Sequence, residues 1–168
     1  MEDDGRRGGT PPPAGGSSIG DLVTDPVDRA IVAHLQIDGR KSYREIARSL
    51  GVAEGTVRSR VKRLIDKGAL RIVAVPDPFQ LGYEVLAQIF LRMEPGATKA
   101  AIETLVEWPD VVYVAATVGR ADISIEIVCR GHEELRELLL ERIPTIDGVV
   151  SVDTLIELSV HKFLYRYA

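Results

Sequence analysis

Residues 42–68 carry the pattern that most constrains the fold of this chain: two short amphipathic segments separated by a turn of about three residues. Ser42 with Glu45 three positions later forms a capping box, which begins a helix. Gly51–Ala53 interrupts that helix, and a second helix is predicted over Glu54–Lys67. Because so short a connection makes consecutive helices cross, the pattern predicts a helix-turn-helix unit.

A third helix is predicted immediately before this pair. Asp25 is a favourable N-cap residue, Pro26 suits the first helical position, and Asp28 complements the positive end of the helix dipole. Apolar residues then recur at helical spacing until Asp38-Gly39 ends the pattern. We therefore expect a domain of three helices over residues 22–70.

Positive charge is concentrated in one segment of an otherwise acidic chain. The formal net charge of the whole chain is −4, yet residues 40–71 hold ten Lys/Arg and three acids, a net charge of +7. Residues 72–168 have a net charge of −7. A solvated helical face can carry such a charge, but its coincidence with a helix-turn-helix pattern favours double-stranded DNA as a partner.

The second helix of the pair has an apolar face and an opposite face suited to the major groove. The apolar side of its helical wheel, which should pack on the other two helices, holds Val57, Val61, Leu64 and Ile65. The opposite side is centred on Ser59, where small hydrogen-bonding side chains allow close approach to base edges while flanking cations neutralise phosphates. The predicted DNA-binding residues are Arg44, Gly55, Thr56, Arg58, Ser59, Arg60, Lys62 and Arg63.

Two segments outside the three helices have the composition of a tail and a connection. Residues 1–21 are rich in Gly, Pro and Ser, and they cannot bury enough apolar surface to offset the entropy of ordering, so we predict a disordered tail. Leu70–Val75 is predicted to be a strand or wing, which the prolines of Pro76-Asp77-Pro78 break. We assign residues 71–82 to the wing and linker.

The remaining residues, 83–168, alternate strand and helix patterns. The order βαββαβ is the ferredoxin-like plan, so the expected fold class is α+β: a winged helix-turn-helix followed by a ferredoxin-like domain. The predicted strands are Tyr83–Arg92, Val111–Val118, Asp122–Cys129 and Val149–Val160, and the predicted helices are Thr98–Trp108 and His132–Ile143.

The apolar pattern of the predicted sheet favours a homodimer. Two helices can cover only one face of four strands, yet Leu86 and Phe90 punctuate the second face of the first strand and Leu155 does so in the last. Scattered surface hydrophobes are common, but large apolar residues on an uncovered face are typical of a partner surface, most simply a second copy.

The sequence offers little for catalysis or for a membrane. His34, His132 and His161 are dispersed without metal-ligand spacing, and Cys129 lies in a strand pattern without a basic neighbour, so no cofactor or metal is expected. There is no apolar run of membrane-spanning length and no secretory signal, and the single cysteine fits a reducing cytoplasm. An enzyme on a ferredoxin-like scaffold and a non-specific architectural DNA-binding protein remain as alternatives.

The order and spacing of these motifs resemble the Lrp/AsnC (feast/famine) family of transcriptional regulators. The likeness begins with Ser42–Val52 and Thr56–Leu64 in the helix-turn-helix. It continues with Asp77-Pro78 and Leu81-Gly82 in the linker, and Gly119–Asp122 resembles the family's Gly-x-x-Asp turn. One departure is that the recognition helix begins with Ala53 and Glu54, where the family has a hydroxyl cap followed by proline.

The resemblance implies a regulator of transcription that binds a small effector, commonly an amino acid or related metabolite, between regulatory domains. It also implies dimers that can build larger rings or octamers. The effector-binding residues that it suggests are Gly119, Arg120 and Asp122, with Thr154 as a further candidate. For Asp122 the alternative is a turn residue that satisfies local backbone N–H groups.

Overall fold

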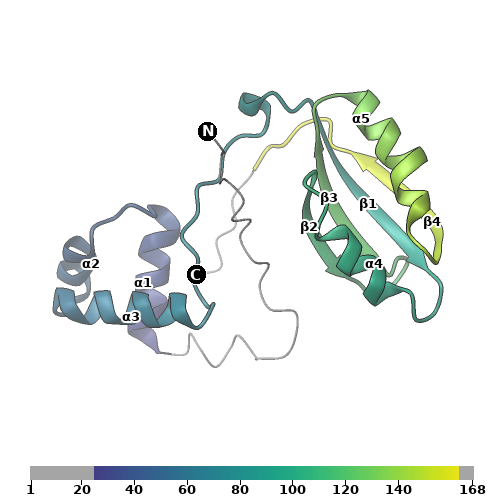
Figure 1. Cartoon of the computed structure of the whole chain (residues 1–168). Helices are drawn as coiled ribbons and strands as arrows, with labels where there is room; N and C mark the ends of the chain where they lie inside the picture. The colour runs from purple at the N-terminus through teal and green to yellow at the C-terminus, as the bar shows by residue number, and fades with distance from the viewer. Residues whose placement is uncertain (1–24, 163–168) are drawn as a thin grey trace, which may run out of the picture. The chain divides into compact units, whose positions relative to one another are not determined.

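The computed structural model describes residues 25–162, which form two units, one ending at Ala74 and the other spanning Val75–Lys162 (Figure 1). The tail predicted over residues 1–21 lies outside the described residues.

The first unit contains three helices, α1 (Pro26–Ile37), α2 (Tyr43–Leu50) and α3 (Glu54–Asp66). Local capping explains where α1 and α2 begin. The Asp25 carboxylate accepts the backbone N–H of Val27 at 2.8 Å, and Ser42 and Glu45 form the predicted capping box. The core that joins the three helices contains Ile31, Leu35, Ile46, Ala47, Val57 and Val61.

Two predictions for this unit are wrong. Ile65 is 44% exposed rather than packed in the core, because the side of α3 that faces the core is centred on Val57, Val61 and Leu64. No strand forms over Leu70–Val75, where the backbone has no regular secondary structure. A strand needs a partner for its N–H and C=O groups, and the four strands found among residues 25–162 all pair in the sheet of the second unit.

The second unit is a four-stranded antiparallel sheet of order β2-β3-β1-β4, the predicted ferredoxin-like plan (Figure 1). The helix α5 continues into a π turn, Leu138–Arg142, and a 3₁₀ turn, Ile143–Thr145. The elements are β1 (Val85–Met93), α4 (Thr98–Leu105), β2 (Val111–Ala116), β3 (Ile123–Cys129), α5 (His132–Glu137) and β4 (Val149–Ile156), preceded by a 3₁₀ turn at Phe79–Leu81.

The core of the second unit lies between the sheet and its two helices. Antiparallel pairing places Ile89 opposite Ile125 and Leu91 opposite Ile123, and all four side chains are buried. Residues of α4 and α5, such as Leu105, pack on this face. The alternation of apolar and polar residues in β1 and β3 therefore has the cause that the sequence predicts, since one face of the sheet is covered and the other is not.

Several predicted ends of elements are too long. The α4 helix ends at Leu105 rather than Trp108, and β4 ends at Ile156 rather than Val160. The last backbone hydrogen bond after β4 is donated by the N–H of Glu157 to the carbonyl of Leu86, near the beginning of β1. Beyond it the neighbouring strand has ended, so the apolar residues up to Val160 have no ladder to join.

Gly148, which directly precedes β4, is closely packed against Ala97. Its φ is +81°, and a Cβ there would lie 2.4 Å from the Cβ of Ala97. We expect Gly148→Ala to destabilise the second unit by about 2–4 kcal/mol, because left-handed backbone strain adds to overpacking. The matched control is Gly96→Ala, where φ is +90° but nothing lies within 4 Å, so only the backbone cost remains. Urea denaturation followed by Trp108 fluorescence measures both, and equal losses would contradict the packing argument.

Candidate functional site

The outward face of α3 is lined by small side chains at its beginning. Val57, Val61 and Leu64 are buried on one side, while Gly55 and Ser59 are exposed on the other. The Ser59 hydroxyl donates to the carbonyl of Thr56 at 3.0 Å, which keeps it close to the helix. A Cβ on Gly55 would meet nothing within 4 Å, so this end of the helix is open to a large ligand.

The beginning of α3 lacks a side-chain cap but carries an ion pair. Ala53 occupies the N-cap position and makes no capping hydrogen bond. Glu54 Oε1 instead lies 2.7 Å from Arg58 Nη2, one helical turn further on. The Arg58 guanidinium also lies over the Tyr43 ring of α2, 5.6 Å from its centroid. These contacts hold Arg58 at the edge of α3 that faces α2.

The cations around this face differ in how firmly they are held. Lys62 Nζ lies 2.6 Å from Asp66 Oδ2, and both side chains are largely exposed, as they are in the Glu54–Arg58 pair. Surface pairs of this kind contribute about 0–1 kcal/mol, so a phosphate can replace the carboxylate at little cost. On α2, Arg44 is exposed and takes part in none of the ion pairs found among residues 25–162.

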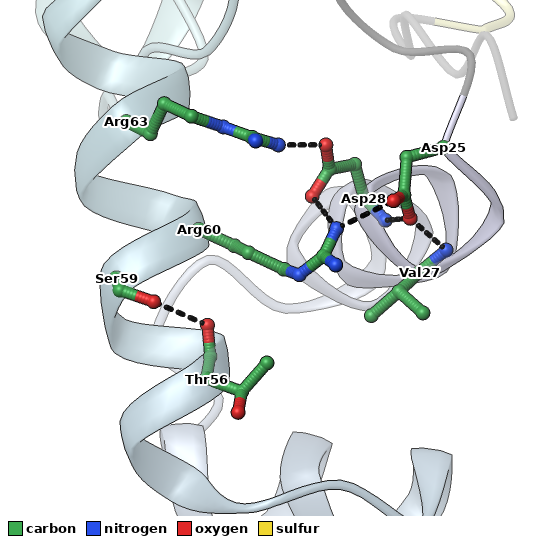
Figure 2. Close-up of polar contacts among 7 residues, drawn as sticks. All are labelled: Asp25, Val27, Asp28, Thr56, Ser59, Arg60 and Arg63. Atoms are coloured by element: carbon green, nitrogen blue, oxygen red, sulfur yellow. Dashed lines mark hydrogen bonds and ion pairs between the residues drawn. The ribbon is translucent and has the colours of Figure 1, made fainter.

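Two predicted DNA-binding residues, Arg60 and Arg63, instead reach back to α1 (Figure 2). Arg60 Nη1 lies 2.9 Å from both Asp25 Oδ2 and Asp28 Oδ1, and Arg63 Nη2 binds Asp28 Oδ2. The Arg60 hydrogen bond holds the pKa of Asp25 below its usual value, and the carboxylates of Asp28 and Asp25 raise the pKa of Arg60. We call these four residues the α1–α3 clamp.

Sequence reasoning missed the clamp although a signal for it was present. Asp28 lies in the first turn, where an acid complements the dipole of α1, yet its spacing to Ile31 and Leu35 is that of one helical face. An acid on the core stripe of a helix needs a cationic partner from another helix. The wheel of α3 places Arg60 at the edge of its own apolar stripe, which is where such a partner must lie.

The loop predicted to bind an effector is held to the end of β1. The Asp122 carboxylate accepts the backbone N–H of Met93 at 2.8 Å, and the Asp122 N–H donates to the carbonyl of Leu91 at 2.9 Å. Arg120 does not pair with Asp122, since its guanidinium lies over the Phe90 ring, 5.0 Å from the centroid. Asp122 thus acts as a turn residue that satisfies a nearby backbone N–H group. Arg120 and Gly119 are exposed.

Thr154 is not brought together with this loop within one chain. It pairs with Ile89 of β1 and so lies on the helix-covered side of the sheet, whereas Phe90 and the Arg120 side chain over it lie on the other side. The adjacent strands β1 and β3 both separate β4 from β2, the strand that leads into the loop.

The uncovered face of the sheet carries the three residues predicted for a dimer interface. Leu155 is 48% exposed and Phe90 is half-buried, but Leu86 is already buried and has little surface left to cover. Glu126 lies near the centre of this face, beside Gln88 of β1 and Tyr113 of β2. Partial burial, and next the charge of Glu157, raise the pKa of the Glu126 carboxyl.

The groups considered for other chemistry have structural surroundings. Cys129 is buried in the sheet core, and burial, with a smaller contribution from Asp110, raises the pKa of its thiol to about 11, so the reactive thiolate is scarce at neutral pH. No cluster of three His, Cys, Asp or Glu side chains that could hold a metal occurs in the described part of the chain. None of the helices over residues 25–162 is long and apolar enough to cross a membrane.

A helix-turn-helix with a small-residue recognition face, joined to a ferredoxin-like domain, defines the class of DNA-binding transcriptional regulators. Comparison with known proteins supports this assignment and makes it specific. Residues 25–65 match the AsnC-type helix-turn-helix domain, and residues 86–166 match the Lrp/AsnC ligand binding domain. The chain belongs to the Lrp/AsnC family of transcriptional regulators.

Individual relatives agree with the family assignment over most of the chain. The HTH-type transcriptional regulator PH0140 of Pyrococcus horikoshii is 41% identical over 142 residues, covering 84% of this chain and 90% of that protein. The regulatory protein AsnC of Escherichia coli is 32% identical over 141 residues, covering 81% of this chain and 91% of AsnC. The solved structure of E. coli AsnC superimposes with a TM-score of 0.74 at 30% identity, covering 84% of this chain and 97% of the other.

Proposed function

We propose that this regulator reads a specific DNA sequence with the first half of α3, as a homodimer whose affinity for DNA responds to an amino acid or a related metabolite. The observation that carries the DNA-binding part is the stripe formed by Gly55, Thr56 and Ser59, which combines small hydrogen-bonding side chains with open space around Gly55. No other described helix of this unit offers such a stripe beside several exposed cations.

The chemistry of the stripe fits the major groove. Thr and Ser hydroxyls donate to or accept from base edges, and a glycine beside them lets the helix approach closely. The exposed cations Arg44, Arg58 and Lys62 flank the stripe and are suited to phosphates, which position the helix without reading sequence. An architectural protein would need only the cations, so the dependence of site choice on the hydroxyls separates the two functions.

We expect the Thr56→Ala/Ser59→Ala double variant to select a different DNA site while the slope of log Kobs against log salt stays unchanged, because hydroxyls read bases and release no counterions. Lys62→Gln should keep the site but lower the magnitude of that slope by about 0.9, the value for one phosphate contact. Selection from random duplexes and salt titrations by fluorescence anisotropy measure both effects.

Thr104→Ala is the matched control for the hydroxyl variants. Thr104 is an exposed helical residue of the second unit whose hydroxyl donates to the carbonyl of Ala100 at 3.1 Å, much as Ser59 does to Thr56. It should change neither the selected site nor the salt slope. If the double variant selected the original site, the proposed orientation of α3 on DNA would be wrong.

The homodimer is supported by the uncovered sheet face of the second unit. Phe90, Tyr113, Val128 and Leu155 lie on it, together with polar groups such as Gln88 that can satisfy a docked surface. Two copies related by a two-fold axis would present two α3 helices to a pseudo-palindromic site, with half-sites about 34–36 Å apart or a multiple of that spacing.

We expect Leu155→Arg to shift the chain from dimer to monomer at micromolar concentration, because the charged guanidinium would lose its water in an interface that buries an apolar side chain at this position. Leu140→Arg is the matched control, since Leu140 is 64% exposed but lies in the π turn of the helix layer, which covers the opposite face. Sedimentation velocity distinguishes the species. A wild type that sediments as a monomer at this concentration would overturn the proposed dimer.

The effector is proposed to bind beside Gly119 and Arg120. The Lrp/AsnC ligand binding domain covers residues 86–166, and the regulator NMB0573 of Neisseria meningitidis, whose solved structure is a complex with L-Met, shares the fold of this chain with a TM-score of 0.75 at 20% identity. The exposed Arg120 guanidinium can bind an amino-acid carboxylate. Asp122 keeps one oxygen on Met93 and contributes its negative charge near a ligand ammonium group.

We expect Arg120→Gln to abolish stabilisation by the effector while leaving the melting temperature without ligand nearly unchanged, since Arg120 is exposed and its guanidinium lies over the Phe90 ring. Asp122→Ala should lower that basal melting temperature as well, because the N–H of Met93 loses its acceptor at a cost of about 1–3 kcal/mol. Thermal-shift screening of the common amino acids measures both. Stabilisation of the wild type by none of them would contradict an amino-acid effector.

We propose that the chain acts in the cytoplasm and has no catalytic activity. Its single cysteine is buried, and Cys129 has the raised thiol pKa of an unreactive core residue.

A further inference from the structure

Asp28 is the most unusual residue of the helix-turn-helix unit. Its side chain is 1% exposed, and it is the one charged residue that is buried in the described part of the chain. It lies on the same face of α1 as Ile31 and Leu35, where an apolar residue is the ordinary choice. A carboxylate in that position is costly unless both of its oxygens have partners, so its retention needs a reason.

Both oxygens of Asp28 are bound by arginines of α3 (Figure 2). Arg60 takes Oδ1 at 2.9 Å and Arg63 takes Oδ2, while Asp25 adds a second carboxylate to Arg60 at 2.9 Å. The two arginines are three positions apart on one edge of the helix, so the carboxylate bridges one turn of α3. A two-point contact fixes both the rotation of α3 about its axis and its position along α1.

The clamp is electrically neutral, with two carboxylates against two guanidinium groups. Moving Arg60 and Arg63 to DNA phosphates would leave Asp28 as a buried, unpaired charge, which is the most destabilising outcome for such a pair. Arg58 and Lys62 face no such barrier, because their partners Glu54 and Asp66 are exposed and hydrate when released.

We propose that Asp28 is a positioning residue for DNA reading: through Arg60 and Arg63 it sets which side chains of α3 face the bases, and these two arginines are not phosphate contacts. This inference rests on the proposed DNA-binding function of α3 and corrects the role that the sequence pattern assigns to Arg60 and Arg63. The clamp determines specificity through helix orientation, without touching DNA.

Arg63→Gln and Lys62→Gln form a matched pair of neutralising substitutions on adjacent residues of α3, made in the full chain. Arg63→Gln should weaken binding to the preferred site about equally at every salt concentration, leaving the slope of log Kobs against log salt unchanged. Lys62→Gln should lower the magnitude of that slope by about 0.9. By calorimetry, Arg63→Gln should also lower the melting temperature of the helix-turn-helix unit by about 10 °C or more, and Lys62→Gln should not.

Asp28→Asn and the Asp28→Asn/Arg63→Gln double variant complete the test. The double variant should melt no lower than the less stable of the two single variants, because all three variants lack the same contact between Asp28 and Arg63. Asp28→Asn should also broaden the set of DNA sites selected from random duplexes. If Asp28→Asn fails to fold, the Arg63→Gln and Lys62→Gln comparison still decides, since Arg60 continues to bind Oδ1 of Asp28 in both variants.

An Arg63→Gln variant whose salt slope falls by about 0.9 at an unchanged melting temperature would overturn the inference, because Arg63 would then be a phosphate contact. Additive losses of melting temperature for Asp28→Asn and Arg63→Gln would also overturn it. A wild type that binds no duplex would overturn the proposed function instead, while the coupling between Asp28 and Arg63 would still support the clamp as the contact that sets α3 on α1.

Discussion

The position of α3 in the helix-turn-helix unit depends on a carboxylate, that of Asp28, which is almost completely removed from water. The helix-turn-helix unit is small, and its core rests on a few aliphatic side chains such as Ile31, Ile46 and Val57. Apolar contacts are non-directional, so a core of this size tolerates small rotations of α3. The bond of Asp28 to two guanidinium groups has a defined direction, and it supplies the angular restraint that the apolar core cannot.

The two units of the chain solve the packing problem in different ways. In the second unit, Ile89, Leu91, Ile123 and Ile125 belong to a continuous apolar layer under two helices, and the ion pair between Arg142 and Asp110 is only partly buried. Such a layer leaves one face of the sheet free, and that face carries Phe90, Leu155 and the partly buried Glu126. The unit that reads DNA thus fixes one helix by charge, whereas the unit that is proposed to pair and to sense a metabolite keeps an apolar face for a second copy.

Local pattern predicted what is decided locally. The capping box of Ser42 and Glu45, the alternation of Ile123, Ile125 and Ile127 and the order of elements were all predictable from the sequence. The strand predicted at Leu70–Val75 does not form, and local sequence could not show this, because a strand needs a hydrogen-bonding partner from elsewhere in the chain. The clamp was missed for the same reason: it joins residues 32 and 35 positions apart, and the helical wheel of α3 by itself does not show which acid of another helix pairs with Arg60 and Arg63.

The clamp also changes how the charge of α3 should be counted. Each of its four cations, Arg58, Arg60, Lys62 and Arg63, is paired with a carboxylate in the free protein. The high number of basic residues in α3 therefore does not make it attract every polyanion strongly, since long-range attraction depends on net local charge. Non-specific affinity, which is almost wholly electrostatic, is reduced more than specific affinity, which also draws on the base contacts that we propose for Thr56 and Ser59. Pairing its own cations therefore favours discrimination between sites over tight binding to all of them.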